Sequence, residues 1–404
     1  MSLSVLQLAN KGINPPDGGT MGITLFTREL ARLGHQVTLL ALTTEKHNNP
    51  NIFPESLAEH IQLISVPVKT NPSIGSLFIH FCGRRERAYM AKRFYHLAVK
   101  QQLIEHLKAY KYDIIQLEGP YMGLYLPTIQ KYSDAIVILR AHNLEFRIWE
   151  RKAQMASGLT KALYKTISKE LKAFEQNLFT QCEGILPITQ VDAREIASLA
   201  PDVPQMVIPF CTDFTKKQIT RKPLRRNGIG YLGALDWQPN IEGLYWFIQK
   251  VWPLLRHQNP NITLQIAGRN ASKRLQQDLS NAIGVEFLGE IPNAEIFLTQ
   301  QSALVVPLWS GSGIRVKIIE GMSLGLPMVV TSMALEGIEA IDGEQLLVAN
   351  TPEDFAAKIN TLLSNRQQAA ILGLKAQEFT YHQFNPEKWF PELIQFYQNL
   401  AAHD

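Results

Sequence analysis

A glycine-rich turn in the second half of the chain carries the residues best suited to chemistry. Ser310-Gly311-Ser312-Gly313 follows the apolar run Ala303 to Val306, and a helical pattern begins at about Ile314. The N–H groups and the positive dipole end at the start of a helix attract anions. Arg315 and Lys317 fall in the first helical turn, where the dipole disfavours cations, so we expect a phosphate-bearing ligand to bind there.

Glu320 lies one turn further along the same helical pattern. A carboxylate at that position is poorly placed for the phosphate itself but well placed to accept hydrogen bonds from ribose hydroxyls. The glycines of the turn would let a ligand approach the backbone closely. The same spacing also fits an ordinary βα turn with a solvated charged face, and the residues alone leave both interpretations open.

Two positions in the first half of the chain are further candidates. Gly18-Gly19 precedes the helical pattern Met21 to Leu33, which favours a backbone lying close to a diphosphate or sugar; a mobile loop is the alternative. His142 lies in the loop Arg140 to Glu145, beyond the carboxyl end of an expected strand, where α/β sheets bind ligands. It would donate to a sugar hydroxyl or a phosphate, or else serve as a structural histidine.

The elements that must position these residues alternate between short apolar strands and amphipathic helices. The expected strands are Ser4–Leu8, Val37–Leu42, Ile61–Val66, Asp113–Leu117, Ala135–Leu139, Gly184–Ile188, Met206–Pro209, Ile229–Gly233, Ile262–Ala267, Val285–Gly289, Ala303–Val306, Met328–Val330 and Gln345–Val348. The expected helices are Met21–Leu33, a region from Asn71 to about Tyr110, Lys161–Phe179, Glu242–Leu255, Pro352–Leu363 and Pro386–Leu400, with further helix starts at Thr189, Glu295 and Ile314.

Two consecutive β/α series predict an α/β protein with two Rossmann-like doubly wound domains facing across a cleft. We expect an N-terminal domain over 1–214, a basic linker over 215–228 and a second domain over 229–385. The aromatic-rich helix in 386–404 is expected to cross back onto the N-terminal domain.

Composition limits the class of protein. The chain has 404 residues, 46% hydrophobic and 19% charged, with a net charge of +4, which is too weak to indicate nucleic acid. No apolar run is long enough to span a membrane, and the N-terminus resembles a strand rather than a signal peptide. Three scattered cysteines indicate a reducing, cytoplasmic compartment and no metal site. The basic, aromatic region Arg84 to Arg93 fits an anionic membrane surface or a solvated helix face equally well.

Several segments resemble the retaining GT-B glycosyltransferases of family 4. The most specific is GSGIRVKIIEGMSLGLPMVVT, which resembles the family's nucleotide-sugar loop. PPDGGTMGITLFTRELARLGHQVTLL resembles the acceptor-side opening, AHNLE the loop whose histidine lies near the donor sugar, and VIPFCTDF the segment before the hinge. IGYLGALDWQPN and LQIAGR resemble the first two strands of the donor domain, so the resemblance covers nearly the whole chain.

The resemblance implies a role for each candidate residue. Glu320 would hold the donor ribose, His142 the transferred sugar, and Gly19 would approach the diphosphate. The remaining donor-side positions are Ser312, Gly313, Ile314 and Gly268. The family has glutamate where this chain has Ser312, and it has two cations in the loop that is Ala234 to Asn240 here. We hypothesise that Arg315 and Lys317 supply the missing positive charge.

The implied activity is transfer of a sugar from a UDP- or GDP-sugar with retention, without a prosthetic group or a metal. The acceptor would be a glycan, a lipid-linked glycan or a small molecule, in polysaccharide biosynthesis, with contact at the inner membrane face left open. Two alternatives remain: a sugar-nucleotide epimerase of the same architecture, and a non-catalytic sugar-nucleotide-binding protein.

Overall fold

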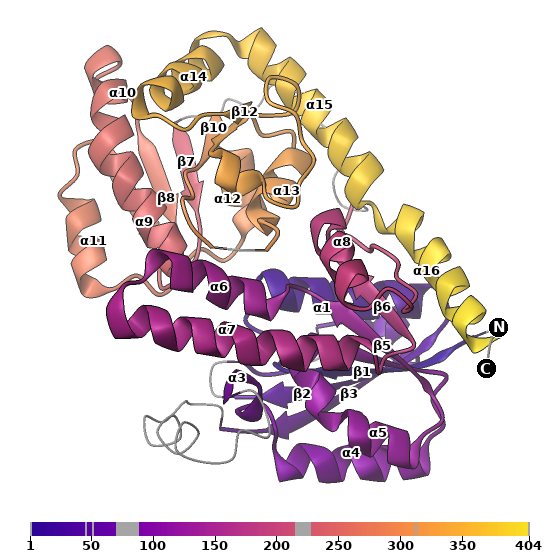
Figure 1. Ribbon diagram of the computed structural model, residues 1–404. Coiled ribbons are helices and arrows are strands. Elements are labelled where there is room, and N and C mark those ends of the chain that lie inside the picture. The colour runs from indigo at the N-terminus through magenta and orange to yellow at the C-terminus, as the bar shows by residue number, and fades with distance from the viewer. Residues whose placement is uncertain are drawn as a thin grey trace. The chain divides into compact units, whose positions relative to one another are not determined.

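The computed structural model describes residues 2–44, 47–50, 52–69, 89–214, 228–311 and 313–402 (Figure 1). Contacts within the chain group it into two units. Unit 1 comprises Met1–Cys211 together with Pro386–Asp404, and unit 2 comprises Thr212–Asn385. No helix in the described part of the chain has the length and hydropathy needed to cross a membrane.

Unit 1 is built on a six-stranded parallel sheet with the order β3-β2-β1-β4-β5-β6. The strands are β1 Ser4–Ala9, β2 Gln36–Thr43, β3 Ile61–Pro67, β4 Ile114–Glu118, β5 Ile136–Ala141 and β6 Gly184–Pro187. The central strands are apolar along nearly their whole length because helices cover both faces of the sheet. The order reverses between β1 and β4, so a crevice for ligands is expected beyond their carboxyl ends.

The helices of unit 1 surround this sheet (Figure 1). They are α1 Gly18–Arg32, α3 Tyr89–Lys92, α4 Leu97–Ala109, α5 Leu126–Tyr132, α6 Glu145–Met155, α7 Gly158–Phe179, α8 Gln190–Leu199 and α16 Pro386–Ala401. The last of these, α16, buries Phe390, Leu393 and Tyr397 against the core that contains Val5 and Phe26. The C-terminal helix therefore completes the hydrophobic core of unit 1.

Unit 2 repeats the same topology. Its parallel sheet has the order β12-β11-β10-β7-β8-β9, and the strands are β7 Ile229–Leu232, β8 Leu264–Ala267, β9 Val285–Gly289, β10 Ala303–Val306, β11 Met328–Val330 and β12 Leu347–Val348. The helices are α9 Gln238–Trp246, α10 Trp252–Gln258, α11 Lys273–Ser280, α12 Ala294–Thr299, α13 Val316–Ser323, α14 Pro352–Ser364 and α15 Arg366–Phe384. Two Rossmann-like units confirm the predicted fold class, and the switch point of this sheet lies between β7 and β10.

Several predicted elements differ from the observed ones. Met206–Pro209 is not a strand, although the Met206 and Ile208 N–H groups donate to carbonyls of β6. The described part of the predicted helix Asn71–Tyr110 is two helices, α3 and α4. They are separate because the backbone is extended at His96, whose N–H donates to the Tyr125 hydroxyl at 2.9 Å. The pattern did not predict α5, α6, α11 or α15.

The start of α1 also differs from the prediction. The helix begins at Gly18, so the paired glycines form its first turn rather than a loop. Asp17 caps the helix by accepting the Thr20 N–H at 2.9 Å, and the Thr20 hydroxyl accepts the Asp17 N–H at 2.6 Å. This reciprocal capping box fixes the helix start, and it overturns the mobile-loop alternative.

Candidate functional site

The switch point of unit 2 holds a group that we call the Lys317 cluster: Leu232, Gly233, Asn240, Arg315 and Lys317. Lys317 lies in the first turn of α13, and its amine donates to the Leu232 carbonyl at 2.7 Å and to the Asn240 side-chain oxygen at 2.9 Å. Leu232 is the last residue of β7, so the amine is anchored at the carboxyl end of a central strand. This is the edge at which doubly wound sheets bind ligands.

Arg315 stands directly before α13 as its N-cap residue and is only 4% exposed. Its guanidinium donates to the Gly313 carbonyl and lies 5.6 Å from the centre of the Trp237 ring. Burial, together with the charge of Arg315, lowers the pKa of Lys317 to about 7. Keeping two neighbouring side chains charged while they are buried costs free energy. A bound anion would stabilise their charged forms.

Asn240 holds the lysine in place. Its side chain is 3% exposed, accepts from Lys317 and donates to the Ala234 carbonyl at 2.9 Å, while its backbone carbonyl accepts the Tyr231 hydroxyl at 2.7 Å. A Cβ atom on Gly233 would lie 2.8 Å from both the Lys317 amine and the Asn240 amide nitrogen. Neither residue was predicted as part of a site, although Asn240 ends the loop Ala234 to Asn240 and Gly233 directly precedes that loop.

The other predicted donor-side residues differ in their burial and backbone conformation. Gly313 has a φ of +81°, a conformation that favours glycine, and Ile314 is half-buried beside it. Ser312 lies outside the described residues. Glu320 is half-buried within α13, one turn beyond Lys317. A Cβ atom on Gly268 would lie 2.0 Å from the Gly233 carbonyl oxygen, so close packing of the ends of β7 and β8 explains this glycine without a ligand.

The switch point of unit 1 holds a different group, the Glu118 cluster: Gln7, Gln116, Glu118, Arg140 and His142. Glu118 ends β4, and its buried carboxylate accepts hydrogen bonds from His142 Nε2 at 2.7 Å, Gln7 at 3.0 Å and Arg140 at 3.2 Å, and one from Gln116. The Arg140 guanidinium also donates to the Gly22 carbonyl of α1 at 3.1 Å. The Tyr397 hydroxyl of α16 donates to Gln116, so the C-terminal helix anchors the same cluster.

The charges of the Glu118 cluster set the state of His142. Burial opposes ionisation of Glu118, but Arg140 and the hydrogen bonds from His142 and Gln116 outweigh burial and lower its pKa to about 2. Burial lowers the pKa of His142, and so does the charge of Arg140. The hydrogen bond to Glu118 raises this pKa but does not outweigh them. An ionised carboxylate can only accept, so the neutral imidazole carries its proton on Nε2 and offers a lone pair on Nδ1.

Gly19 lies in the first turn of α1, beside a charged pair that the sequence analysis did not identify. The Lys11 amine lies 2.7 Å from the Asp17 carboxylate and would be 3.0 Å from a Cβ atom on Gly19. Burial opposes ionisation of Asp17, but Lys11 and the Thr20 N–H lower its pKa to about 2. Among the described residues, no His, Cys, Asp and Glu side chains are grouped as metal ligands.

Comparisons with known proteins match both halves of the chain to glycosyltransferase families. Residues 16–216 match the family described as Glycosyltransferase Family 4, and residues 226–365 match Glycosyl transferases group 1. An uncharacterized 44.6 kDa protein in the cps region of Klebsiella pneumoniae is 24% identical over 398 residues, covering 93% of this chain and 95% of that protein.

Two solved structures share the fold along their whole length. Sucrose-phosphate synthase from Thermosynechococcus elongatus has a TM-score of 0.72 at 16% identity, with both chains covered completely. HepE from Anabaena in complex with UDP has a TM-score of 0.63 at 14% identity, covering 99% of this chain and 100% of that chain. The two units thus have the GT-B fold of nucleotide-sugar glycosyltransferases. The chain belongs to the glycosyltransferases of family 4, with a group 1 domain in its second half.

Proposed function

We propose that the protein transfers a sugar from a nucleotide-diphosphate sugar, UDP- or GDP-linked, to a glycan or lipid-linked glycan acceptor with retention of configuration. The observation that carries this proposal is the pairing of Arg315 with Lys317 at the carboxyl edge of β7, beside the glycine turn. The UDP in the HepE structure and the cps region of the Klebsiella relative support a nucleotide donor and a polysaccharide product. The scattered cysteines support a cytoplasmic location.

The Lys317 cluster suits a leaving diphosphate. As the bond between the sugar and the diphosphate breaks, negative charge grows on the phosphate oxygens. Fixed cations and helix N–H groups stabilise that charge, and one such preorganised donor is commonly worth about 3–4 kcal/mol. Lys317, with a pKa near 7, would take up a proton as the anion binds, because the anion favours its charged form. We assign Glu320 to the donor ribose on the same helix.

Retention follows from a same-face substitution. The bond from the anomeric carbon to the diphosphate breaks, and the bond to the acceptor hydroxyl forms on the same face of the sugar. The leaving phosphate oxygen accepts the hydroxyl proton, so the reaction needs no base from the protein. In unit 1 we assign His142 to a sugar hydroxyl. Glu118 accepts a hydrogen bond from the proton-bearing Nε2 of His142, so the sugar hydroxyl would donate to the lone pair on Nδ1.

A thermal-shift panel tests the donor assignment. A ligand at one hundred times its dissociation constant stabilises the folded protein by about 2.7 kcal/mol. Either UDP or GDP, but not both, should therefore raise the Tm. The shift should disappear in Lys317→Met and persist in Lys250→Met, which changes an exposed lysine of the same unit. No shift with any nucleoside diphosphate would overturn the proposal. NMR of the product made from the identified donor would then report the anomeric configuration.

A further inference from the structure

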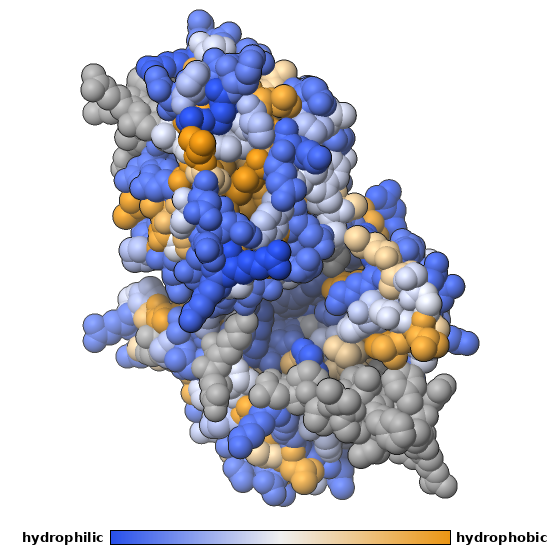
Figure 2. All heavy atoms as spheres, turned by 90° about the vertical axis from the view of Figure 1, so that its left-hand side faces the viewer, coloured by the Kyte–Doolittle hydropathy of each residue, from blue (hydrophilic) through white to orange (hydrophobic). Residues whose placement is uncertain are grey.

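The turn between α6 and α7 of unit 1 exposes apolar side chains. Met155 at the end of α6 is 72% exposed, and Leu159 at the start of α7 is 90% exposed, the highest value for a large hydrophobic side chain in the described ranges. Residues 153–160 contain no charged side chain. Figure 2 faces the side of the molecule on which this uncharged tip lies; that side is mainly hydrophilic, with hydrophobic residues in separate patches.

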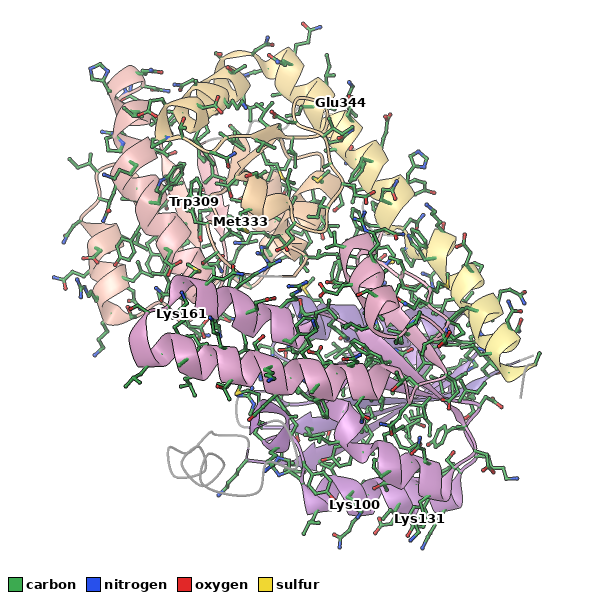
Figure 3. All side chains as sticks on the ribbon, in the orientation of Figure 1. Lys100, Lys131, Lys161, Trp309, Met333 and Glu344 are labelled. Carbon is green, nitrogen blue, oxygen red and sulfur yellow. The ribbon has the colours of Figure 1, made fainter. Side chains whose placement is uncertain are left out.

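Lysines stand on both sides of the tip. Lys152 precedes it in α6. Lys161, which Figure 3 labels, follows it in α7. Four lysines of α7 and parts of α6, including Phe146, Glu150 and Ala153, line one groove of about 490 Å³; the lysines are Lys161, Lys165, Lys169 and Lys172. They recur along one stripe of the helix over about 16 Å, at 1.5 Å per residue.

This hairpin concentrates the positive charge of the chain. The hairpin, residues 145–179, contains seven basic and four acidic residues, a net charge of +3, and the whole chain carries +4. Lysines spaced by four residues on one helix repel one another. Within the part of the chain that the structure describes, no ion pair joins the four lysines of the groove to a carboxylate. Of the four, Lys172 lies 5.4 Å from the centre of the Phe146 ring of α6.

We infer that the α6–α7 hairpin binds the surface of an anionic phospholipid bilayer, with its apolar tip among the lipid headgroups and its lysines on the lipid phosphates. A basic stripe attracts any polyanion, but a soluble polyanion would leave Met155 and Leu159 in water. A bilayer interface buries apolar side chains and attracts lysines at the same time. The inference does not depend on glycosyl transfer, and it moves the membrane contact away from Arg84 to Arg93, of which residues 84–88 lie outside the described ranges.

Vesicle flotation of the full chain tests the charge. The protein should float with vesicles of equal parts phosphatidylglycerol and phosphatidylcholine and stay behind with phosphatidylcholine alone. Changing Lys161, Lys165 and Lys169 to Gln should lower partitioning about a hundredfold, since each lysine near an anionic surface is worth roughly fivefold. The matched control changes Lys100, Lys108 and Lys131 of α4 and α5 to Gln, with the same loss of charge elsewhere in unit 1 (Figure 3). Equal losses in the two variants would overturn the inference.

A second pair of variants tests the tip. Leu159→Ser should lower partitioning roughly tenfold, because it removes one apolar side chain from the interface. Leu97→Ser, at a 69% exposed leucine of α4, should leave partitioning unchanged. A tryptophan in Met155→Trp should shift its emission to the blue when phosphatidylglycerol vesicles are added. If Leu159→Ser partitions like the native protein while soluble polyphosphate still releases the chain from vesicles, the groove binds a polyanion and the bilayer inference is wrong.

Discussion

The two sheets of this protein share one strand order, yet the charges at their switch points differ. In unit 1 a buried carboxylate, Glu118, is the acceptor at the centre of its cluster. In unit 2 an amine, Lys317, is the donor at the centre of its cluster. The same topology therefore presents a neutral histidine at one edge and two cations at the other. The scaffold fixes where a ligand binds, and the side chains at the strand ends decide its charge.

The largest expected effect comes from breaking the centre of the Glu118 cluster. Glu118→Ala leaves Arg140 buried without its carboxylate, and loss of one partner of a buried ion pair costs about 3–5 kcal/mol of unfolding free energy. Chemical denaturation measures this loss. Asp113→Ala, at the other end of β4, removes a carboxylate that accepts the Ser4 N–H at 2.7 Å near the surface and should cost about 1 kcal/mol. Similar losses in the two variants would show that Glu118 does not hold the cluster together.

Breaking the Lys317 cluster should lower the affinity for the ligand rather than the stability of the protein. Lys317→Met removes a cation whose burial already lowers its pKa, so the apo protein should keep or gain stability. Affinity for the nucleoside diphosphate should fall about a hundredfold, or about 2.7 kcal/mol. Calorimetric titration gives the affinity and denaturation gives the stability. A variant that loses stability but keeps its affinity would reverse the roles assigned to the two clusters.

The two clusters should also respond to different ranges of pH. Glu118 has a lowered pKa, so its stabilisation is present above its ordinary value of 4.5 and is lost as the pH falls towards 2. Lys317 also has a lowered pKa, and the unfolded chain keeps that proton up to its ordinary value of 10.5, so stability rises from pH 7 upward. Relative to Lys317→Met, the native protein should gain about 1–2 kcal/mol between pH 7 and 9. A constant difference between the two proteins across this range would contradict the lowered pKa.

The smallest effect should come from the residue that positions the lysine. Asn240→Asp keeps an oxygen near the Lys317 amine but adds a charge that competes with the diphosphate, so affinity should fall roughly tenfold. The new carboxylate should also raise the pKa of Lys317, and proton uptake on nucleotide binding should disappear. Titration calorimetry in two buffers of different ionisation enthalpy measures that uptake. If proton uptake on nucleotide binding were the same in Asn240→Asp as in the native protein, Asn240 would not influence the protonation of Lys317.

The sequence predicted much of the fold from local patterns. Apolar runs located the strands of both sheets, because strands buried on both faces are apolar along their length, but they also predicted a strand at Met206–Pro209 that is not formed. The prediction of one helix over Asn71–Tyr110 was wrong for its described part, because the break at His96 depends on a hydrogen bond to the distant Tyr125. The glycine turn and the pair Arg315 and Lys317 were identifiable because they are close together in the chain.

Other functional features became visible only in three dimensions. Glu118 directly follows the predicted strand Asp113–Leu117 and was not predicted as a site residue, and its partners Gln7 and Arg140 come from two other strands of the sheet. The lysines of α7 are scattered along the sequence, and only the helix places them on one stripe beside α6.

By itself, the sequence determined the class of fold, the family motif and the presence of cations near a helix start. These depend on residues within a few positions of one another, where propensity and spacing act directly. Only the tertiary structure decided that Asn240 holds Lys317, that Glu118 holds His142, and that Tyr397 of α16 donates to Gln116. Each of these contacts joins residues far apart in the chain, and burial, which sets their charge states, exists only once the chain has folded.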